Sequence, residues 1–488
     1  MATVRRLGWL LLPWLAMQGC ATSPPAARHF PSRTVPRPAP VPAAKVATET
    51  FPSGMRLVVR ETPSASKVTM YMSYRVGATD EPAGKEGLAE LAARLTLMAR
   101  HGGASAQTME ARFEAADVTT SNTVTHDDTE LWSTVVPARF ARVVVLEAQR
   151  LSEPLAHVTE EDFRRVRARQ MDDLWARYES RDQGPARRWV HEKLLAGHAY
   201  GRPVGGIPEG LERITLEDVR AFVKANYTPA HAVLVVSGPL PLADAKFEVA
   251  RAFAGFKGVG SEARIRPIER VPPPAPPDAP GGAPMEVVRG SVKVPQLHFL
   301  LTLPGRYSGK YTEGRVAMEA IKWWMEANTK RDEYPLGKSF SVLYQELDGL
   351  TVLDCAVDLM EHVREEEARK LVPSMLGTLD AYADRMTEGM KGTEFGPSTP
   401  FQWEHGATGM ASRGPSSRLR AILDGEIRQQ AGTASPMNIA RTLRATGRAD
   451  IRRLREEQMT QAFTYGVMSP YLRQYLRAER VRTLLILP

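Results

Sequence analysis

The sequence predicts an α+β protein made of two tandem halves, each a mainly antiparallel sheet packed with helices. The first observation is a low-complexity stretch, residues 271–284, in which Pro, Ala and Gly dominate. Such a stretch is typical of a linker, so we assign residues 259–284 as a Pro-rich linker between domains 46–258 and 285–488. The second observation is that both domains show the same order of elements.

Each domain opens with strand-like segments and closes with a helix and an apolar strand. In the first domain the opening strands are residues 55–60 and 68–76. Its closing helix is 216–226, followed by a strand at 232–238. The matching segments of the second domain are 286–289, 296–302, 471–477 and 481–487. Long helical segments lie between these strands in both domains.

Composition is ordinary for a globular chain of 488 residues, with 43% hydrophobic and 25% charged residues. The formal charge is +8, and residues 411–488, with 14 Arg, no Lys and 6 acids, account for +8 by themselves. These Arg residues alternate with Leu, Ile and Ala, which favours solvated helix faces over a functional basic surface. No nucleic-acid motif accompanies them, so we expect no nucleic-acid partner.

The first 45 residues have the features of a targeting signal followed by a tether. Arg5 and Arg6 precede an apolar run that ends at Gly19-Cys20, so residues 1–19 resemble a bacterial lipoprotein signal peptide and Cys20 becomes the lipidated first residue. A simple secretory signal is the alternative. Residues 20–45, rich in Pro and Ala, form the expected tether. These features predict a protein on the periplasmic face of the bacterial envelope, lipid-anchored in the outer membrane.

Cys355 is the other cysteine, and two cysteines are too few for a disulfide framework. It lies in the alternating segment 350–358, which predicts a strand and a buried, inert thiol. No apolar run after residue 20 is long enough for a membrane span.

Three segments of the first domain resemble the pitrilysin/insulinase (inverzincin) metallopeptidases. Residues 74–89 resemble the strand and loop that lead into that family's zinc-binding helix. Asp127-Asp128-Thr129 resembles its Asp-x-Thr on an edge strand, and residues 197–206 resemble its His-Pro-Tyr-Gly segment. The resemblance covers residues 50–258 best. It implies two peptidase-like halves that enclose part of a peptide-holding chamber, which a second subunit often completes.

The family's catalysis depends on His-x-x-Glu-His, in which two His bind zinc and Glu acts as the base. Aligned on Gly87, this chain has Glu90 and Arg94 at the two His positions and Ala93 at the base position. A guanidinium about 4 Å from Zn²⁺ would be repelled by roughly 8 kcal/mol at an effective dielectric constant near 20. The resemblance thus implies no catalytic residues, metal ligands or cofactor here, although active members carry zinc.

The spacing offers a different use of these residues. Glu90 and Arg94 stand at i and i+4 on the predicted helix, in the favourable order for an ion pair. We therefore expect them to pair across the former metal site. The core-facing stripe of this helix is Leu88, Leu91, Leu95 and Met98. The family's third zinc ligand falls near residues 170–173, where the sequence does not fix the register.

Other parts of the family's apparatus are also altered. Ser121-Asn122-Thr123 replaces the polar Asn-Ala-x-Thr of its substrate-binding edge strand, although an edge strand still accepts an extended peptide. In the second domain Tyr344 is a candidate remnant of a substrate-binding Tyr, and residues 416–419 match a family motif only by chance. The histidines suggest no further metal site, because His101 and His126 are isolated and His191 and His198 have the wrong spacing.

These observations favour a catalytically inactive peptidase-like lipoprotein. Its expected partners are a zinc-bearing paralogous subunit in a hetero-oligomer, extended peptides, and the membrane through its lipid anchor. Two alternatives remain. An active zinc metalloendopeptidase with unusual ligands would bind zinc and cleave peptides, and a stand-alone envelope scaffold would keep the fold without a partner.

Overall fold

The computed structural model describes residues 45–178, 184–256, 285–290, 292–329, 337–391, 422, 423, 425, 435–464 and 468–488. The predicted signal peptide, the lipidated Cys20, the linker 259–284 and the segment 416–419 lie outside the described residues, so those assignments stay predictions.

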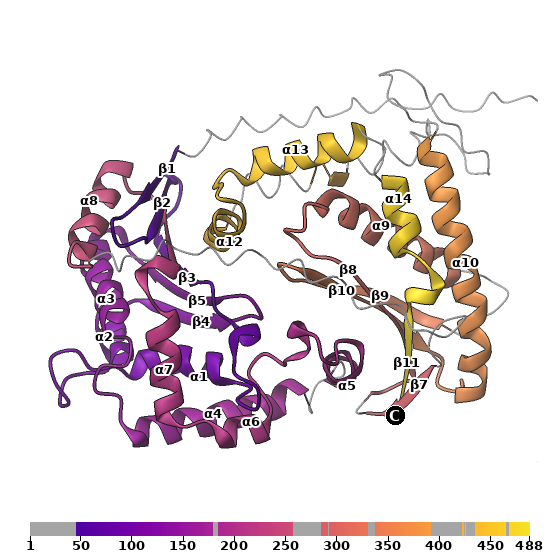
Figure 1. Ribbon diagram of the computed structural model, residues 1–488, viewed down its shortest axis with the longest axis horizontal. Coiled ribbons are helices and arrows are strands. Elements are labelled where there is room, and N and C mark those ends of the chain that lie inside the picture. The colour runs from indigo at the N-terminus through magenta and orange to yellow at the C-terminus, as the bar shows by residue number, and fades with distance from the viewer. Residues whose placement is uncertain are drawn as a thin grey trace, which may run out of the picture. The chain divides into compact units, whose positions relative to one another are not determined.

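The strands of the first domain form one six-stranded sheet, here called sheet A. Its strand order is β1-β2-β6-β3-β5-β4, with β2 and β6 parallel and all other neighbours antiparallel. Strand β4 is therefore an open edge (Figure 1). The strands are β1 Lys45–Thr50, β2 Arg56–Glu61, β3 Val68–Tyr74, β4 Thr119–Val124, β5 Thr129–Val135 and β6 Ala232–Gly238.

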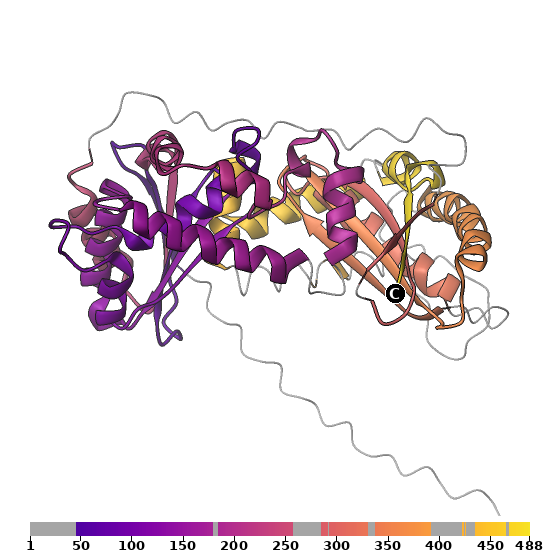
Figure 2. The same cartoon turned by 90° about the horizontal axis from the view of Figure 1, so that it is seen from below.

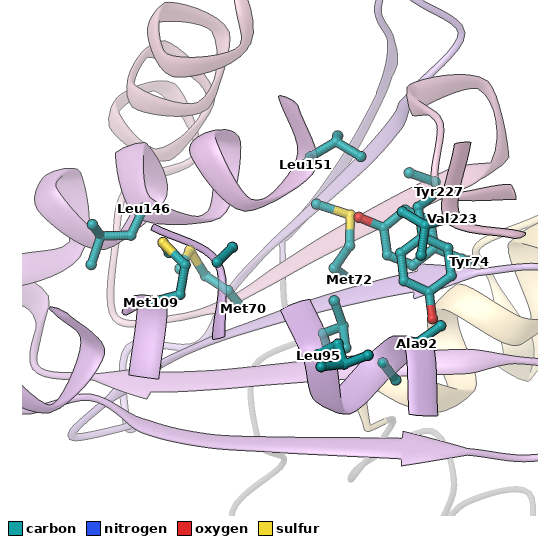
Figure 3. Close-up of a cluster of buried hydrophobic side chains, with 14 of the residues drawn as sticks. Met70, Met72, Tyr74, Ala92, Leu95, Met109, Leu146, Leu151, Val223 and Tyr227 are labelled. Carbon is teal, nitrogen blue, oxygen red and sulfur yellow. The ribbon is translucent and has the colours of Figure 1, made fainter. Parts of the chain in front are cut away.

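Helices cover one face of sheet A because its apolar side chains alternate along the strands. Met72 and Tyr74 of β3 point to this face near Leu95 and Tyr227, and Met70 lies on the same face near Met109 and Leu146 (Figure 3). The predicted stripe of α1 is confirmed, since Leu88, Leu91, Leu95 and Met98 are all buried. The helices are α1 Leu88–Leu95, α2 Met109–Ala115, α3 Phe140–Ser152, α4 Glu160–Tyr178, α5 Gly184–Trp189, α6 Pro208–Arg213, α7 Leu216–Asn226 and α8 Leu242–Phe253.

The second domain forms a five-stranded sheet, sheet B, in the order β7-β11-β8-β10-β9. Only β7 and β11 are parallel, and β9 is an open edge. Cys355 lies on β10, as expected, and burial raises the pKa of its thiol well above the usual value. The strands are β7 Glu286–Arg289, β8 Gln296–Pro304, β9 Gly337–Glu346, β10 Leu350–Leu359 and β11 Arg482–Leu487.

One face of sheet B carries its own helices in the same way. Phe299 of β8 lies edge-on against Trp324 of α9, with 5.7 Å between the ring centroids. Leu379 of α10 and Leu472 of α14 belong to the same buried cluster. The helices of this domain are α9 Tyr311–Thr329, α10 Glu365–Lys391, α12 Pro436–Thr446, α13 Ile451–Thr464 and α14 Met468–Tyr475.

The opposite face of each sheet is covered by a helix from the other domain. Ile439 and Leu443 of α12 pack on Tyr71 and Val233 of sheet A, so the yellow helix lies beside the indigo strands (Figures 1 and 2). In return, Trp189 of α5 packs on sheet B and donates to Glu286 at 2.9 Å. Each sheet therefore lies within one predicted domain, but α5 and α12 each cover the sheet of the other domain.

The predicted fold class is confirmed: two mainly antiparallel sheets, each packed with helices, follow one another along the chain. Among the described residues no helix has the length and apolarity that a membrane span requires.

The exchanged helix α12 makes a testable contribution to stability. Ile439 is 3% exposed, and Ile439→Ala would leave a cavity against strands of the other domain. We expect the free energy of unfolding to fall by about 2–4 kcal/mol, measured by urea denaturation with fluorescence detection. Val145→Ala, at a half-exposed position of α3, is the control and should change it by less than about 0.5 kcal/mol. Equal effects of both substitutions would contradict the packing of α12 on sheet A.

Candidate functional site

Helix α1 begins at a glycine that the local geometry requires. Gly87 has φ +105°, a left-handed conformation, and a Cβ there would lie 2.7 Å from the carbonyl oxygen of Gly205. The carboxylate of Glu81 accepts hydrogen bonds from the backbone N–H groups of Gly87 and Ala89, at 3.0 and 2.8 Å. These bonds satisfy two donors at the helix N-terminus, so the loop of residues 81–87 fixes where α1 starts.

Four charged side chains fill the position of the family's metal site. The Arg94 guanidinium donates to Glu90 at 2.6 Å, which confirms the predicted ion pair. Two residues of α4 complete the network: Asp173 lies 2.6 Å from Arg94, and Arg177 lies 3.2 Å from Glu90. The buried Glu90 carboxylate is thus shared by two guanidinium groups.

The structure also settles which part of α4 faces this site. Asp173 and Arg177, one turn apart, reach the α1 residues directly. Gln170, one turn earlier, is fully buried and instead donates to the carbonyl oxygens of Gly87 and Gly205, both at 2.9 Å. Asp173 and Arg177 are therefore the residues of α4 that face α1 at this site, which the sequence alone left open.

These residues do not fit a zinc ion. Zinc sites consist of thiolate, imidazole and carboxylate ligands, whereas Arg94 and Arg177 place two cations there. Ala93, at the position of the family's catalytic base, is buried and has no proton-accepting side chain. In the part of the chain that the structure describes, no group of three or more His, Cys, Asp or Glu side chains could hold a metal ion.

The edge strand next to this network remains accessible. Alternation along β4 sends Asn122 toward α1, where its amide donates to the carbonyl oxygen of Ala93 at 2.9 Å. Ser121 and Thr123 point to the opposite face and are exposed. A cavity of about 490 Å³, here called the α1–β4 cavity, is lined by residues 120–124 together with side chains of α1 and α4.

One predicted edge-strand assignment is wrong. Asp127 and Asp128 lie in the turn between β4 and β5, and Thr129 opens β5, which is an inner strand because β4 pairs with it. The turn directs these carboxylates away from the edge and toward the second domain. Asp127 accepts hydrogen bonds from the Tyr200 hydroxyl at 2.8 Å and from the backbone N–H of Asp348 at 3.0 Å.

A buried arginine of α12 completes this connection. Arg444 is 2% exposed and pairs with Asp128 in the turn between β4 and β5 and, at 2.6 Å, with Asp348 in the turn between β9 and β10. Arg441, one turn earlier, pairs with Glu130 at 2.5 Å. The prediction of solvated helix faces is therefore wrong for Arg441 and Arg444. The apolar residues around them on α12 were the feature of the sequence that could have indicated a buried helix face.

These turns line a second cavity of about 600 Å³, here called the central cavity, bounded by residues 124–128 and 343–348. Tyr344 lines it from the edge strand β9, half-exposed, with the Arg315 guanidinium 5.2 Å from its ring centroid. Val124 and Arg177 line both cavities, so the two adjoin along β4. The role of Tyr344 as a remnant of a substrate-binding residue stays a prediction.

His126 is not isolated, contrary to the sequence-based expectation. Its ring lies 5.8 Å from that of His191 and 5.6 Å from that of Tyr200, and His198 lies 5.5 Å from Tyr200. Burial, with a smaller contribution from His191, lowers the pKa of His126 to about 3. His126 is therefore a neutral group of the structural core at the wall of the central cavity.

Comparisons with known proteins show which fold this chain shares. A family model described as "Peptidase M16 inactive domain" matches residues 213–350. The inactive M16 peptidase domain from Pseudomonas fluorescens is similar in structure over 91% of this chain and 98% of that one, with TM-score 0.64 and 15% identity. A putative M16-like peptidase from Alicyclobacillus acidocaldarius is similar over 92% and 99%, with TM-score 0.66 and 14% identity.

The fold is that of the M16 peptidases. The predicted resemblance to the pitrilysin/insulinase family is thereby confirmed. The first half of the periplasmic protease PqqL from Escherichia coli is similar over 92% of this chain and 93% of that one, with TM-score 0.66 and 12% identity. Against the whole PqqL chain the similarity covers 48% of its length. A comparison with curated protein sequences gives no match.

The buried His126 predicts a pH dependence. Its folded-state pKa lies below that of the unfolded chain, so stability is lost as pH falls from about 6.5 toward 3. Between pH 7.5 and 5 we expect His126 to lower the free energy of unfolding by about 2 kcal/mol, measured by urea denaturation at each pH. His126→Gln should remove this part of the slope, whereas His362→Gln at an exposed position should leave it unchanged. An unchanged slope in His126→Gln would contradict the assignment.

Proposed function

We propose that the chain is a catalytically inactive M16-like protein that holds extended peptides and acts as the partner of a zinc-bearing paralogous subunit. The observation that carries this proposal is the contrast between two neighbouring features. The metal position is filled by the Glu90–Arg94–Asp173–Arg177 network, and the edge strand β4 beside it stays open to a cavity of about 490 Å³. The chain lacks the family's zinc ligands and catalytic base, whereas the backbone of the edge strand β4 remains available to pair with a peptide.

Peptide binding at this edge needs no catalytic group. An open edge strand presents unpaired N–H and C=O groups, to which an extended peptide adds as a further strand. Ser121 and Thr123 are exposed on one face of β4, and Asn122 fixes the strand to α1. Among similar structures, that of the ferredoxin protease FusC contains a bound protein, Arabidopsis ferredoxin. Binding of polypeptides by this chain is therefore consistent with its fold.

The proposal includes a place in the cell. Gly19-Cys20 and the Pro/Ala-rich residues that follow support a lipidated protein on the periplasmic face of the envelope, anchored in the outer membrane. Such an anchor would keep the chain and its partner subunit at one surface. The proposed partner would supply the zinc, the general base and the cleavage.

The partner can be identified in the native envelope. We expect chemical cross-linking in mild detergent, followed by mass spectrometry, to give one stoichiometric partner whose sequence contains His-x-x-Glu-His. Cys20→Ala should move the protein from the membrane to the soluble fraction without changing its fold, which separates anchoring from assembly. A stable monomer without any stoichiometric partner would contradict the subunit role and favour a stand-alone scaffold. Chelator-sensitive peptide cleavage by the isolated chain would instead indicate an active zinc metalloendopeptidase.

A further inference from the structure

The α1–β4 cavity is lined by guanidinium groups, which can bind an anion. Its lining includes three guanidinium groups, from Arg94, Arg169 and Arg177, and two carboxylates, from Glu90 and Glu110. Asp173, which pairs with Arg94, brings the acids of this site to three, equal in number to the guanidinium groups. Guanidinium groups are not metal ligands, which must be anionic or neutral donors. The replacement of ligands has therefore changed what the cavity can attract.

The ion pairs show which of these charges can serve a ligand. Arg94 and Arg177 are balanced by Glu90 and Asp173. Arg169 is exposed on α4, and within the described part of the chain no ion pair or hydrogen bond involves its side chain. Arg169 is thus the guanidinium in this cavity that can bind a ligand without breaking an existing ion pair.

Its position relative to β4 fits an extended peptide. Residues 120–124 of the edge strand line the same cavity as Arg169 and Arg177. These two arginines are eight residues apart on α4, which corresponds to about 12 Å along the helix. Side chains on one face of a peptide strand repeat about every 7 Å. A peptide paired with β4 would therefore lie in the same cavity as both arginines.

We propose that the α1–β4 cavity recognises a carboxylate of the bound peptide, with Arg169 as its main contact. This inference rests on the proposed peptide-holding function and adds a substrate class to it, namely acidic peptides. Guanidinium groups bind carboxylates through paired N–H donors in a planar geometry. The carboxylate comes either from an Asp or Glu side chain or from the C-terminus of the peptide.

Four pools of fluorescein-labelled decapeptides test the inference with the full chain from Ala21. The pools have random flanking residues, carry Glu or Gln at the fifth position, and end in a carboxylate or an amide. We expect fluorescence anisotropy to give about tenfold tighter binding for an acidic pool than for its neutral counterpart. A preference for Glu over Gln identifies a side-chain carboxylate, and a preference for the free acid over the amide identifies the C-terminus.

Three variants and one control locate the contact. Arg169→Gln should bring the preference to about twofold or less, and Arg169→Lys should restore part of it. Glu110→Gln removes a carboxylate of the cavity that has no ion pair among the described residues, and it should increase the preference. Arg164→Gln changes an exposed arginine of the same helix that does not line the cavity, so it should have no effect.

The outcomes separate this inference from the proposed function. Equal binding of acidic and neutral pools, or a preference that Arg169→Gln leaves unchanged, would overturn carboxylate recognition while peptide holding stands. Absence of binding by all four pools would overturn peptide holding itself, and the inference with it.

Discussion

Arg444 is the residue on which the arrangement of both edge strands depends. It is 2% exposed and pairs with Asp128, in the turn after β4, and with Asp348, in the turn after β9. Loss of one partner from such a buried group typically costs 3–5 kcal/mol, because the remaining charges stay buried without compensation. Helix α12 can supply this guanidinium only because its apolar residues, Ile439 and Leu443, dock on sheet A.

A second charged network replaces the metal centre. Glu90, Arg94, Asp173 and Arg177 neutralise one another within about 3 Å, so α1 and α4 are connected where a zinc ion would otherwise join them. The helix keeps its buried stripe, and β4 keeps its place at the edge of sheet A. The fold has therefore kept the helix and the edge strand while the side chains at the family's ligand and base positions differ.

Local patterns predict what depends on local spacing. The strands near residues 56–61 and 232–238, the helix 216–226 and the Glu90–Arg94 pair follow from alternation, periodicity and i, i+4 geometry. The exchange of α5 and α12 between the domains could not be predicted in this way, because an apolar helix face does not reveal which sheet it covers. For the same reason the His126–His191 contact and the burial of Arg444 depend on distant segments that spacing cannot bring together.

The central claim is that ion pairs have replaced the zinc site, and the zinc content of the purified protein tests it most directly. The chain from Ala21, purified without chelator and without a His tag, should contain well below one zinc ion per molecule by mass spectrometry. About one zinc ion per molecule, lost when Glu90 or Asp173 is replaced, would contradict this account. The four charged residues would then be ligands or neighbours of a metal, and the chain would be a candidate enzyme.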